Sequence, residues 1–304
     1  MVYDVIIIGS GPAGLAAAIY GKRARLRTLV IEKQPMSGGQ ILNTYEVDNY
    51  PGLPGIGGFE LGQKFREHAE KMETEFVTAE VTGIAEKKEI KRVLTDKGEY
   101  ETKTIILATG ANHRKLGVPG EEELCGMGVS YCATCDGAFF RGRAVAVVGG
   151  GDVALEDALF LARACKKVYL IHRRNEFRGA KVLQEQVAQA ENIEVIWDTV
   201  VEEIKGDGQV QALALFDKKK EEKSELPVDG VFIAVGIEPN TAQIEDAVEL
   251  DEGGYIIAGE NTKTSVQGIF AAGDVRTKPL RQVVTAAADG ANAITAVENY
   301  LHGL

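Results

Sequence analysis

The stretch Val5-Ile6-Ile7-Ile8-Gly9-Ser10-Gly11-Pro12-Ala13-Gly14 decides the fold of this chain. Its apolar, β-branched half predicts a strand buried on both faces of a parallel sheet, and residues 15–20 predict a helix. The G-x-G-x-x-G turn between them lets the backbone approach a pyrophosphate at the positive end of that helix. A second predicted strand, residues 28–31, ends at Glu32, whose carboxylate can accept hydrogen bonds from a ribose. We therefore expect a dinucleotide site here, with a glycine-rich turn that binds nothing as the alternative.

The same unit returns in the middle of the chain. Residues 144–148 predict a strand, 155–164 a helix and 167–171 the next strand. The turn between the first two is Gly149-Gly150-Gly151-Asp152-Val153-Ala154. In this repeat Gly9, Gly11 and Gly14 correspond to Gly149, Gly151 and Ala154.

The two copies differ at the end of their second strand. His172 takes the place of Glu32, and it is followed by Arg173, Arg174 and Arg178. A carboxylate there would repel a 2′-phosphate, whereas clustered guanidinium groups bind one. The second site is therefore expected to take NADP(H), and the first a dinucleotide with a free ribose, NAD or FAD. A basic, solvated strand end is the alternative.

The repeat extends to the segments that follow each unit. Short alternating segments with tight turns occupy residues 76–84 and 90–95, and again 194–204 and 210–216. Each block closes on an apolar strand, at 105–110 and 231–236. A further strand at 268–274 and a helix at 285–301 are expected to complete the first domain.

The predicted fold class is α/β. We expect two Rossmann-like dinucleotide-binding domains, each with a small antiparallel β insert. The first domain is formed by residues 1–113 and 245–304, and the second by residues 114–244.

The run Tyr131-Cys132-Ala133-Thr134-Cys135-Asp136 suggests a second kind of chemistry. Two cysteines separated by two residues can close a disulfide or hold half a metal site, and in a reducing compartment such a pair is seldom structural. The run predicts the first turn of a short helix, whose positive end favours thiolate, and Asp136 places a proton donor or acceptor beside the sulfur. A zinc site that adds Cys125 and His113 is the alternative. The double nucleotide signature disfavours it, so we expect no resident metal.

Length and charge limit the possible partners. The 304 residues suffice for two domains, and the net charge of −11 disfavours nucleic acid or an anionic membrane. No basic leader precedes the first strand, and no apolar run approaches the roughly 20 residues that span a bilayer. Four cysteines do not make a secreted disulfide scaffold. We expect a cytoplasmic protein.

Taken together, these motifs resemble those of the low-molecular-weight thioredoxin reductases of bacteria, which are class II pyridine nucleotide-disulfide oxidoreductases. The resemblance runs from end to end. The Cys-Ala-Thr-Cys-Asp run inside the second domain is its most specific feature, because the flavin-dependent ferredoxin–NADP reductases of similar layout lack it. The other matching runs are Gly38-Gly39-Gln40, Asn49-Tyr50-Pro51-Gly52, Ala108-Thr109-Gly110, Ala272-Gly273-Asp274 and Arg281-Gln282-Val283.

The resemblance implies two cofactors, each in one domain. FAD would occupy the first domain, on Gly9, Ser10, Gly11, Pro12, Ala13, Gly14, Glu32, Lys33, Gly39, Gln40, Asn49, Val81, Thr109, Gly110, Gly273, Asp274, Arg281, Gln282 and Val283. NADPH would occupy the second, on Gly149, Gly151, Asp152, Val153, His172, Arg173, Arg174, Arg178, Val235 and Gly236. Val153 stands where the family usually carries Ser or Thr, so one hydroxyl bond to a phosphate is missing.

The resemblance also implies roles for the reactive residues. Cys135 would face the flavin, Cys132 would attack the disulfide of thioredoxin, and Asp136 would handle the proton. A homodimer and a rotation of one domain against the other are further implications. We expect hinges near residues 114–120 and 236–241, where glycine and proline collect.

The expected function is an NADPH-dependent flavoprotein disulfide reductase that passes electrons from NADPH through FAD and Cys132–Cys135 to thioredoxin. Reduction of another small dithiol protein stays open. So does a flavin-dependent dithiol oxidase that hands electrons to oxygen, although the arginine cluster disfavours it. A third possibility is a nucleotide sensor whose cysteines bind zinc or respond to oxidation.

Overall fold

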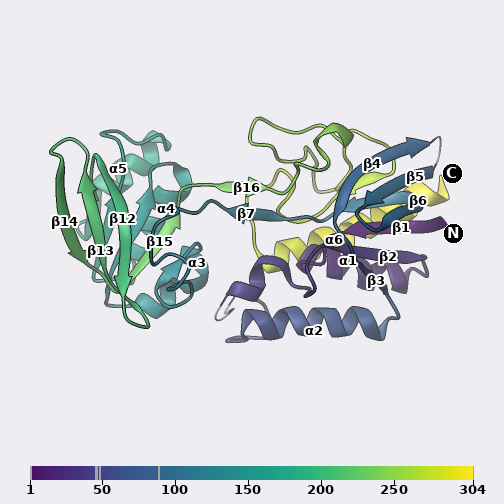
Figure 1. Cartoon of the computed structure of the whole chain (residues 1–304), viewed down its shortest axis with the longest axis horizontal. Helices are drawn as coiled ribbons and strands as arrows, with labels where there is room; N and C mark the ends of the chain where they lie inside the picture. The colour runs from purple at the N-terminus through teal and green to yellow at the C-terminus, as the bar shows by residue number, and fades with distance from the viewer. Residues whose placement is uncertain (1, 45–46, 48, 88–89, 304) are drawn as a thin grey trace. The chain divides into compact units, whose positions relative to one another are not determined.

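The computed structural model describes residues 2–44, 47, 49–87 and 90–303 (Figure 1). The chain divides into two compact units, Met1–Asn112 with Glu238–Leu304, and His113–Ile237. Residues 238–244 thus join the first unit, whereas the sequence placed them in the second. Two contacts account for this: the Asn240 side chain donates to the Thr109 carbonyl at 2.9 Å, and Ile244 is buried in the first unit's core.

The sheet of the first unit is built around the strand that opens the chain. β1 (Val2–Ile8) lies between β2 (Thr28–Glu32) and β6 (Gly98–Leu107), and both run parallel to it. β3 (Glu75–Thr78) pairs in parallel with β2, and β17 (Ile269–Ala271) with β6. The C-terminal segment therefore completes the first sheet, as predicted.

Both faces of β1 are buried, which explains its uninterrupted apolar sequence. Val5 and Ile7 pack under the helices α1 (Pro12–Arg23), α2 (Gly58–Lys71) and α6 (Val283–His302). Ile6 and Ile8 pack on the other side against tail residues that surround the short 3-10 turn η3 (Glu245–Ala247).

The insert of the first unit is smaller than expected. β4 (Val81–Lys87) and β5 (Ile90–Thr95) form an antiparallel hairpin, and β5 pairs with the first half of β6. The segment 76–84, which was expected to belong to the insert as a whole, is divided between the main sheet and the insert. Phe76 and Val77 pair in parallel with β2 and belong to the main sheet, so the insert starts only at Val81.

The sheet of the second unit repeats this plan. β9 (Ala144–Gly149) lies between β10 (Lys167–Ile171) and β15 (Gly230–Ala234), all in parallel. β11 (Ile193–Ile196) pairs with β10, and β8 (Val129–Ser130) pairs with β15. The expected segment 194–204 is likewise divided between two strands, because the chain turns at Asp198, whose φ is +52°.

Helices and an antiparallel sheet cover the two faces of β9. Val145 and Val147 pack under α4 (Asp152–Ala162) and α5 (Lys181–Gln189). Ala146 and Val148 pack against a separate antiparallel sheet, which is the insert of this unit. Its strands are β12 (Thr199–Gly206), β13 (Val210–Asp217) and β14 (Glu222–Pro227).

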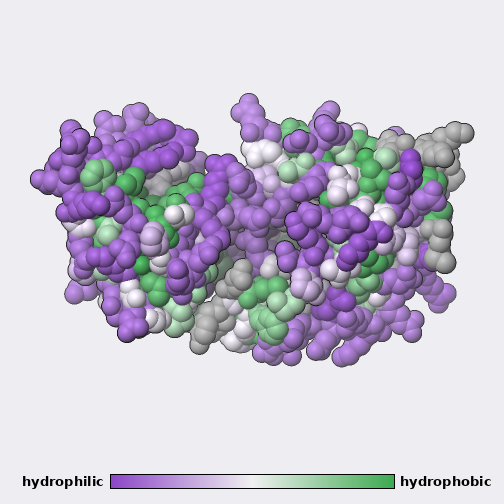
Figure 2. All heavy atoms as spheres, viewed as in Figure 1, coloured by the Kyte–Doolittle hydropathy of each residue, from purple (hydrophilic) through white to green (hydrophobic). Residues whose placement is uncertain are grey.

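Two dinucleotide-type units with antiparallel additions confirm the predicted fold class. No helix within the described residues is long and apolar enough to cross a membrane. Figure 2 shows hydrophilic side chains over most of the visible surface of each unit, in keeping with the net charge of −11.

Candidate active site and nucleotide sites

The two motif cysteines are joined in a disulfide at the start of a short helix. Cys132 and Cys135 are bonded, with their Cα atoms 5.3 Å apart. Cys132 immediately precedes α3 (Ala133–Asp136), the helical turn that the sequence predicts. Its Sγ lies 3.4 Å from the Thr134 hydroxyl, and both cysteines are half-buried. The disulfide is thus partly exposed to solvent.

A carboxyl group lies beside this disulfide on the same helical turn. Ser130 Oγ donates to Asp136 Oδ2 at 2.5 Å, and the Cys132 N–H donates to Ser130 Oγ at 3.1 Å. Burial raises the pKa of Asp136, and the bond from Ser130 acts in the opposite sense. Asp136 therefore takes up a proton more readily than an exposed aspartate. Ser130 was missed in the sequence, where a lone serine before the motif gives no signal.

A second buried carboxylate fixes the segment in front of the cysteines. Glu121 accepts the Tyr131 hydroxyl at 2.7 Å and the backbone N–H groups of Leu116 and Gly117 at 2.9 and 2.7 Å. His113 stacks on the Tyr131 ring with centroids 5.3 Å apart. No sequence pattern indicates this arrangement, because its members are spread over nineteen residues.

The structure does not favour the zinc alternative. The disulfide occupies both sulfurs of the motif, and the described part of the chain holds no cluster of three or more His, Cys, Asp or Glu suited to a metal ion. Cys125 is exposed with a free thiol. Cys165 is buried in the segment between α4 and β10.

The first glycine turn has the shape that a pyrophosphate requires. A Cβ atom added to Gly9 would lie 2.4 Å from the carbonyl oxygen of Ala108. A Cβ atom added to Gly14 would lie 2.0 Å from the carbonyl oxygen of Gly9, so neither position can carry a side chain. A Cβ on Gly11 would meet no described atom within 4 Å, and the Gly38 N–H donates to the Ser10 carbonyl at 2.9 Å. The turn is therefore packed on its inner side only, which fits a bound dinucleotide.

Glu32 is partly engaged within the protein. Its Oε2 accepts both the backbone N–H and the hydroxyl of Ser10, at 2.7 and 2.8 Å, and Oε1 accepts the Gln34 N–H at 2.9 Å. A carboxylate has about four acceptor positions, so one stays available for a ribose hydroxyl. Lys33 instead pairs with Glu80 at the surface, at 2.6 Å.

The C-terminal segment brings an unpaired carboxylate to the same turn. A Cβ atom added to Gly273 would lie 2.9 Å from the Cβ atom of Ala13, so the Gly273–Asp274 turn packs against the first turn of α1. Asp274 Oδ1 is buried and has no hydrogen-bond partner among the described residues. Such an atom fits a hydroxyl of the FAD ribityl chain, because a buried acceptor without a donor is unfavourable.

The other predicted FAD residues lie around this core or at its edge. Asn49 donates to the Gln282 side chain at 2.8 Å, and Gln282 caps α6 through a reciprocal bond with Thr285. Thr109 donates to the Asn240 carbonyl at 2.8 Å. Several of the remaining residues stand at the first positions of elements: Pro12 of α1, Val81 of β4, Val283 of α6, and Gly39 and Gln40 of the 3-10 turn η1 (Gly39–Asn43). Gly110 follows β6, and the Arg281 guanidinium lies over the Tyr255 ring.

The second glycine turn is packed against a histidine. A Cβ atom added to Gly150 would lie 2.2 Å from the His172 ring, so a residue with a side chain does not fit beside this histidine. His172 is only 6% exposed, its Nε2 has no partner among the described residues, and burial lowers its pKa. The ring is therefore neutral at physiological pH and supports the turn. Around it lie Phe177 and Trp197, whose rings are tilted by 47° against each other with centroids 4.3 Å apart.

The arginine loop folds back onto this turn. The Arg178 N–H donates to the Gly150 carbonyl at 2.8 Å, and the Ala180 N–H donates to Asp152 Oδ1 at 2.6 Å. The side chains of Arg173, Arg174 and Arg178 are exposed, and a Cβ on Gly151 would meet no described atom within 4 Å. These features fit a nucleotide with a 2′-phosphate. Val153 is 54% exposed on the first turn of α4, and Val235 and Gly236 follow β15.

Comparison with known proteins identifies relatives that match along the chain. The sequence pattern of the pyridine nucleotide-disulphide oxidoreductases matches residues 3–290. The chain belongs to this family. Among the oxidoreductases of this family, it is 47% identical to a thioredoxin reductase of Peptoclostridium litorale, over 100% of this chain and 98% of the relative. It is 45% identical to the thioredoxin reductase of Bacillus subtilis, over 100% and 96%.

A solved structure extends the likeness to three dimensions. The crystal structure of thioredoxin reductase from Streptococcus pyogenes matches with a TM-score of 0.95 and 45% identity, over 100% of this chain and 99% of that one. The resemblance inferred from the motifs is thereby confirmed. Oxidoreductases of this kind use FAD and NADPH, which confirms the predicted cofactors.

Proposed function

We propose that this enzyme is a thioredoxin-disulfide reductase that uses NADPH and FAD to open its own Cys132–Cys135 disulfide and then reduces a thioredoxin. The observation that carries the proposal is the disulfide itself. It lies beside a buried acid, in a unit that also holds a nucleotide turn with an exposed arginine cluster. Thioredoxin reductases that match over the full chain support the same assignment.

The residues of the first unit are proposed to hold FAD. The glycine turn would contact the pyrophosphate, Glu32 a ribose and Asp274 a ribityl hydroxyl. When bound, FAD accepts a hydride from NADPH and supplies the electron pair that opens the disulfide. The second turn and Arg173, Arg174 and Arg178 would hold NADPH by its pyrophosphate and 2′-phosphate.

The reduced pair, Cys132 and Cys135, then exchanges with the disulfide of the partner. Cys132 attacks one sulfur of the partner disulfide as a thiolate, a mixed disulfide forms, and the partner's other sulfur leaves. Cys135 next attacks Cys132, which releases the reduced partner and restores the Cys132–Cys135 disulfide. Asp136 would take the proton from the attacking thiol and return it to the leaving one. Burial raises the pKa of its carboxyl group, which favours proton uptake.

The assembly and the location of the enzyme are part of the same proposal. The relatives whose names call them thioredoxin reductases support thioredoxin as the partner. A homodimer in the cytoplasm is proposed from the family resemblance, and a reducing compartment suits a disulfide that must cycle. We propose neither nucleic acid nor membrane as a partner, because the net charge of −11 would repel both.

The first test replaces one sulfur. We expect Cys135→Ser to keep FAD and NADPH binding and to abolish NADPH-dependent reduction of thioredoxin, because no disulfide can then form. Cys125→Ser is the matched control, since that thiol is exposed and outside the disulfide, and it should keep the full rate.

Coupled turnover of NADPH with a thioredoxin is the measurement, together with anaerobic titration of the flavin absorbance. Retained turnover in Cys135→Ser would refute the assignment of the disulfide. A wild-type flavin that dithiols bleach and NADPH does not would instead indicate the dithiol oxidase.

A further inference from the structure

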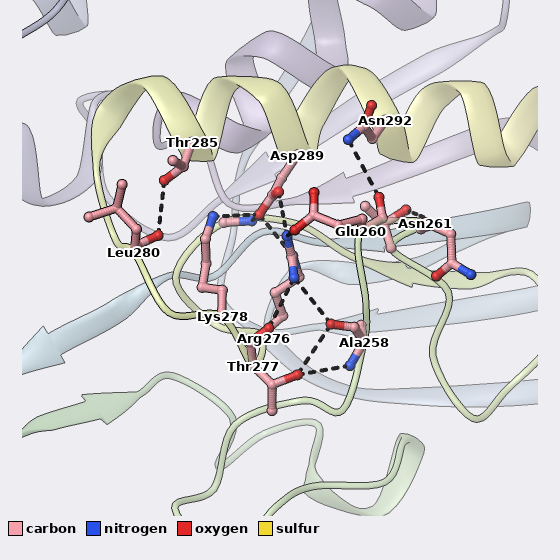
Figure 3. A network of polar contacts seen from close by, with 12 residues as sticks. Ala258, Glu260, Asn261, Arg276, Thr277, Lys278, Leu280, Thr285, Asp289 and Asn292 are labelled. Atoms are coloured by element: carbon pink, nitrogen blue, oxygen red, sulfur yellow. Dashed lines mark hydrogen bonds and ion pairs between the residues drawn. The ribbon is translucent and has the colours of Figure 1, made fainter.

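A buried charge cluster is formed by Asp289, Arg276 and Lys278 (Figure 3). It contacts the backbone N–H of Gly273, the residue that precedes Asp274. Asp289 belongs to α6, and the two cations belong to the loop that connects β17 with α6. Arg276 and Asp289 expose 3% of their side chains and Lys278 exposes 4%. Removing three charges from water is costly, so their placement calls for a reason beyond stability.

Both cations of the cluster bond to the same carboxylate. Asp289 Oδ2 accepts Arg276 Nε at 2.9 Å and Lys278 Nζ at 2.8 Å, and Oδ1 accepts Arg276 Nη2 at 2.7 Å. Asp289 Oδ2 also accepts the backbone N–H of Gly273 at 2.8 Å. Asp289 therefore ties both cations to the turn that carries Asp274.

Arg276 has further anchors, so it stays in place without Asp289. Its Nη1 donates to the carbonyl oxygens of Ala258 and Thr277 at 3.2 and 2.9 Å. Lys278, in contrast, has a single flexible amine that is held by Asp289. Lys278 is thus the member of the cluster that loss of the Asp289 charge would release.

Asp274 is the group that a released lysine would reach. Lys278 Nζ and the Gly273 N–H share Asp289 Oδ2 as their acceptor, each at 2.8 Å, so the ammonium lies beside the residue that precedes Asp274. Burial raises the pKa of Asp274, and the charges of Lys278 and Arg281 act in the opposite sense. Asp274 Oδ1 has no hydrogen-bond partner in the described part of the chain. A buried carboxylate next to an unpaired ammonium would form an ion pair and lose that free acceptor.

We propose that Asp289 is a positioning residue for the flavin site: it holds Lys278 and the Gly273 N–H so that Asp274 keeps an oxygen free for a ribityl hydroxyl. This inference rests on the proposed function, because it takes FAD as the ligand of the first unit. Asp289 itself touches no cofactor in this account.

The test separates charge from shape. Asp289→Asn keeps the size of the side chain and one oxygen that can accept the Gly273 N–H, and it removes the charge that holds Lys278. We expect the Kd of the apoprotein for FAD, measured by quenching of flavin fluorescence, to rise roughly tenfold or more. Asp289→Asn with Lys278→Met removes the competing amine as well. We expect it to recover FAD binding to within about threefold of wild type.

Two controls show that the effect is specific. Glu260→Gln removes the same charge from a side chain that is 85% exposed and lies 3.4 Å from Arg276, and it should leave the Kd unchanged. The melting temperature of each apoprotein shows whether a variant is folded. Lys278→Met alone should bind FAD like wild type, because Arg276 still pairs with Asp289.

The outcomes are distinguishable. Wild-type affinity in Asp289→Asn would overturn the inference and leave the proposed function standing. A double variant that binds FAD as poorly as Asp289→Asn would also overturn it, because competition from Lys278 would then not be the cause. A wild-type apoprotein that binds no FAD would overturn the proposed function and the inference with it.

Discussion

The two carboxylates of the first nucleotide site, Glu32 and Asp274, are used in opposite ways. Glu32 accepts three hydrogen bonds from Ser10 and Gln34, so most of its capacity serves to shape the glycine turn. Asp274 keeps a buried oxygen without a partner among the described residues. A ligand hydroxyl would therefore give Asp274 a hydrogen bond that it lacks within the described residues. We expect loss of the Asp274 carboxylate to weaken FAD binding more than loss of the Glu32 carboxylate would.

The arginine cluster makes a prediction about cofactor choice. Arg173 and Arg174 are exposed at the end of β10, where they can meet a 2′-phosphate. We expect Arg173→Ala with Arg174→Ala to raise the KM for NADPH by roughly ten- to a hundredfold and the KM for NADH by less than about twofold. Steady-state kinetics with both cofactors measures this. Arg141→Ala with Arg143→Ala, an exposed pair in the same unit, should change neither KM, and equal losses for NADPH and NADH would remove the phosphate argument.

Residues with a short, fixed spacing could be found in the sequence, and residues that meet only in space could not. The glycine turns, Cys132, Cys135 and the arginine cluster all lie in short runs whose chemistry depends on that spacing. Ser130, Glu121 and Asp289 reach their partners through tertiary packing, and a single serine or acid carries no signal of its own. The Asp289 cluster joins a helix to a loop that precedes it, which no sequence pattern here indicates.

At the scale of elements, the parallel strands could be predicted best. β10 has the predicted bounds, because a strand buried on both faces is a continuous apolar run. The two edge strands β3 and β11 were merged with the inserts that follow them. Ala79–Glu80 and Trp197–Asp198 turn the chain without glycine or proline, so the usual signals of a turn are missing there.

Helix α4 carries a carboxyl group that makes stability depend on pH. Burial, together with neighbouring Glu156, raises the pKa of Asp157 to about 7. The folded state thus keeps a proton that the unfolded chain releases near pH 4, so stability falls as pH rises from about 4 to 7 and stays low above that. We expect Asp157→Asn, which mimics the neutral acid, to stabilise the protein at pH 8 by up to about 4 kcal/mol and to change little at pH 4.5.

Urea unfolding of the holoprotein at the two pH values measures this difference. Glu156→Gln, an exposed change of the same charge on the same helix, should have a smaller effect. An Asp157→Asn variant that is no more stable than wild type at pH 8 would show that Asp157 is charged in the folded state at no cost.

At the scale of the whole molecule, the chain passes twice from one unit to the other, and these crossings form a short two-stranded sheet. Its strands are β7 (Ala111–His113) and β16 (Ile237–Pro239). On the side of the first unit, Asn240 bonds to Gly110 and Thr109, and on the side of the second, the Arg114 N–H donates to Gly236. Each crossing is therefore hydrogen-bonded at both ends to the unit that it enters or leaves.

These contacts reduce the number of residues that we expect to act as hinges. The sequence suggested residues 114–120, but Glu121 holds Leu116 and Gly117 within the second unit, and Asn240 is tied to the first. If the two units rotate during turnover, we expect the changes in backbone to concentrate at residues 111–113 and 237–239. Hydrogen exchange read by mass spectrometry should then show, on addition of NADPH, altered exchange across β7 and β16, while the amides of Leu116 and Gly117 stay protected. Glu121→Gln is the informative variant, because weaker acceptance should raise exchange at these two amides without NADPH. Altered exchange centred on residues 114–120 in the wild type would instead place the hinge inside the second unit and contradict the role given to Glu121.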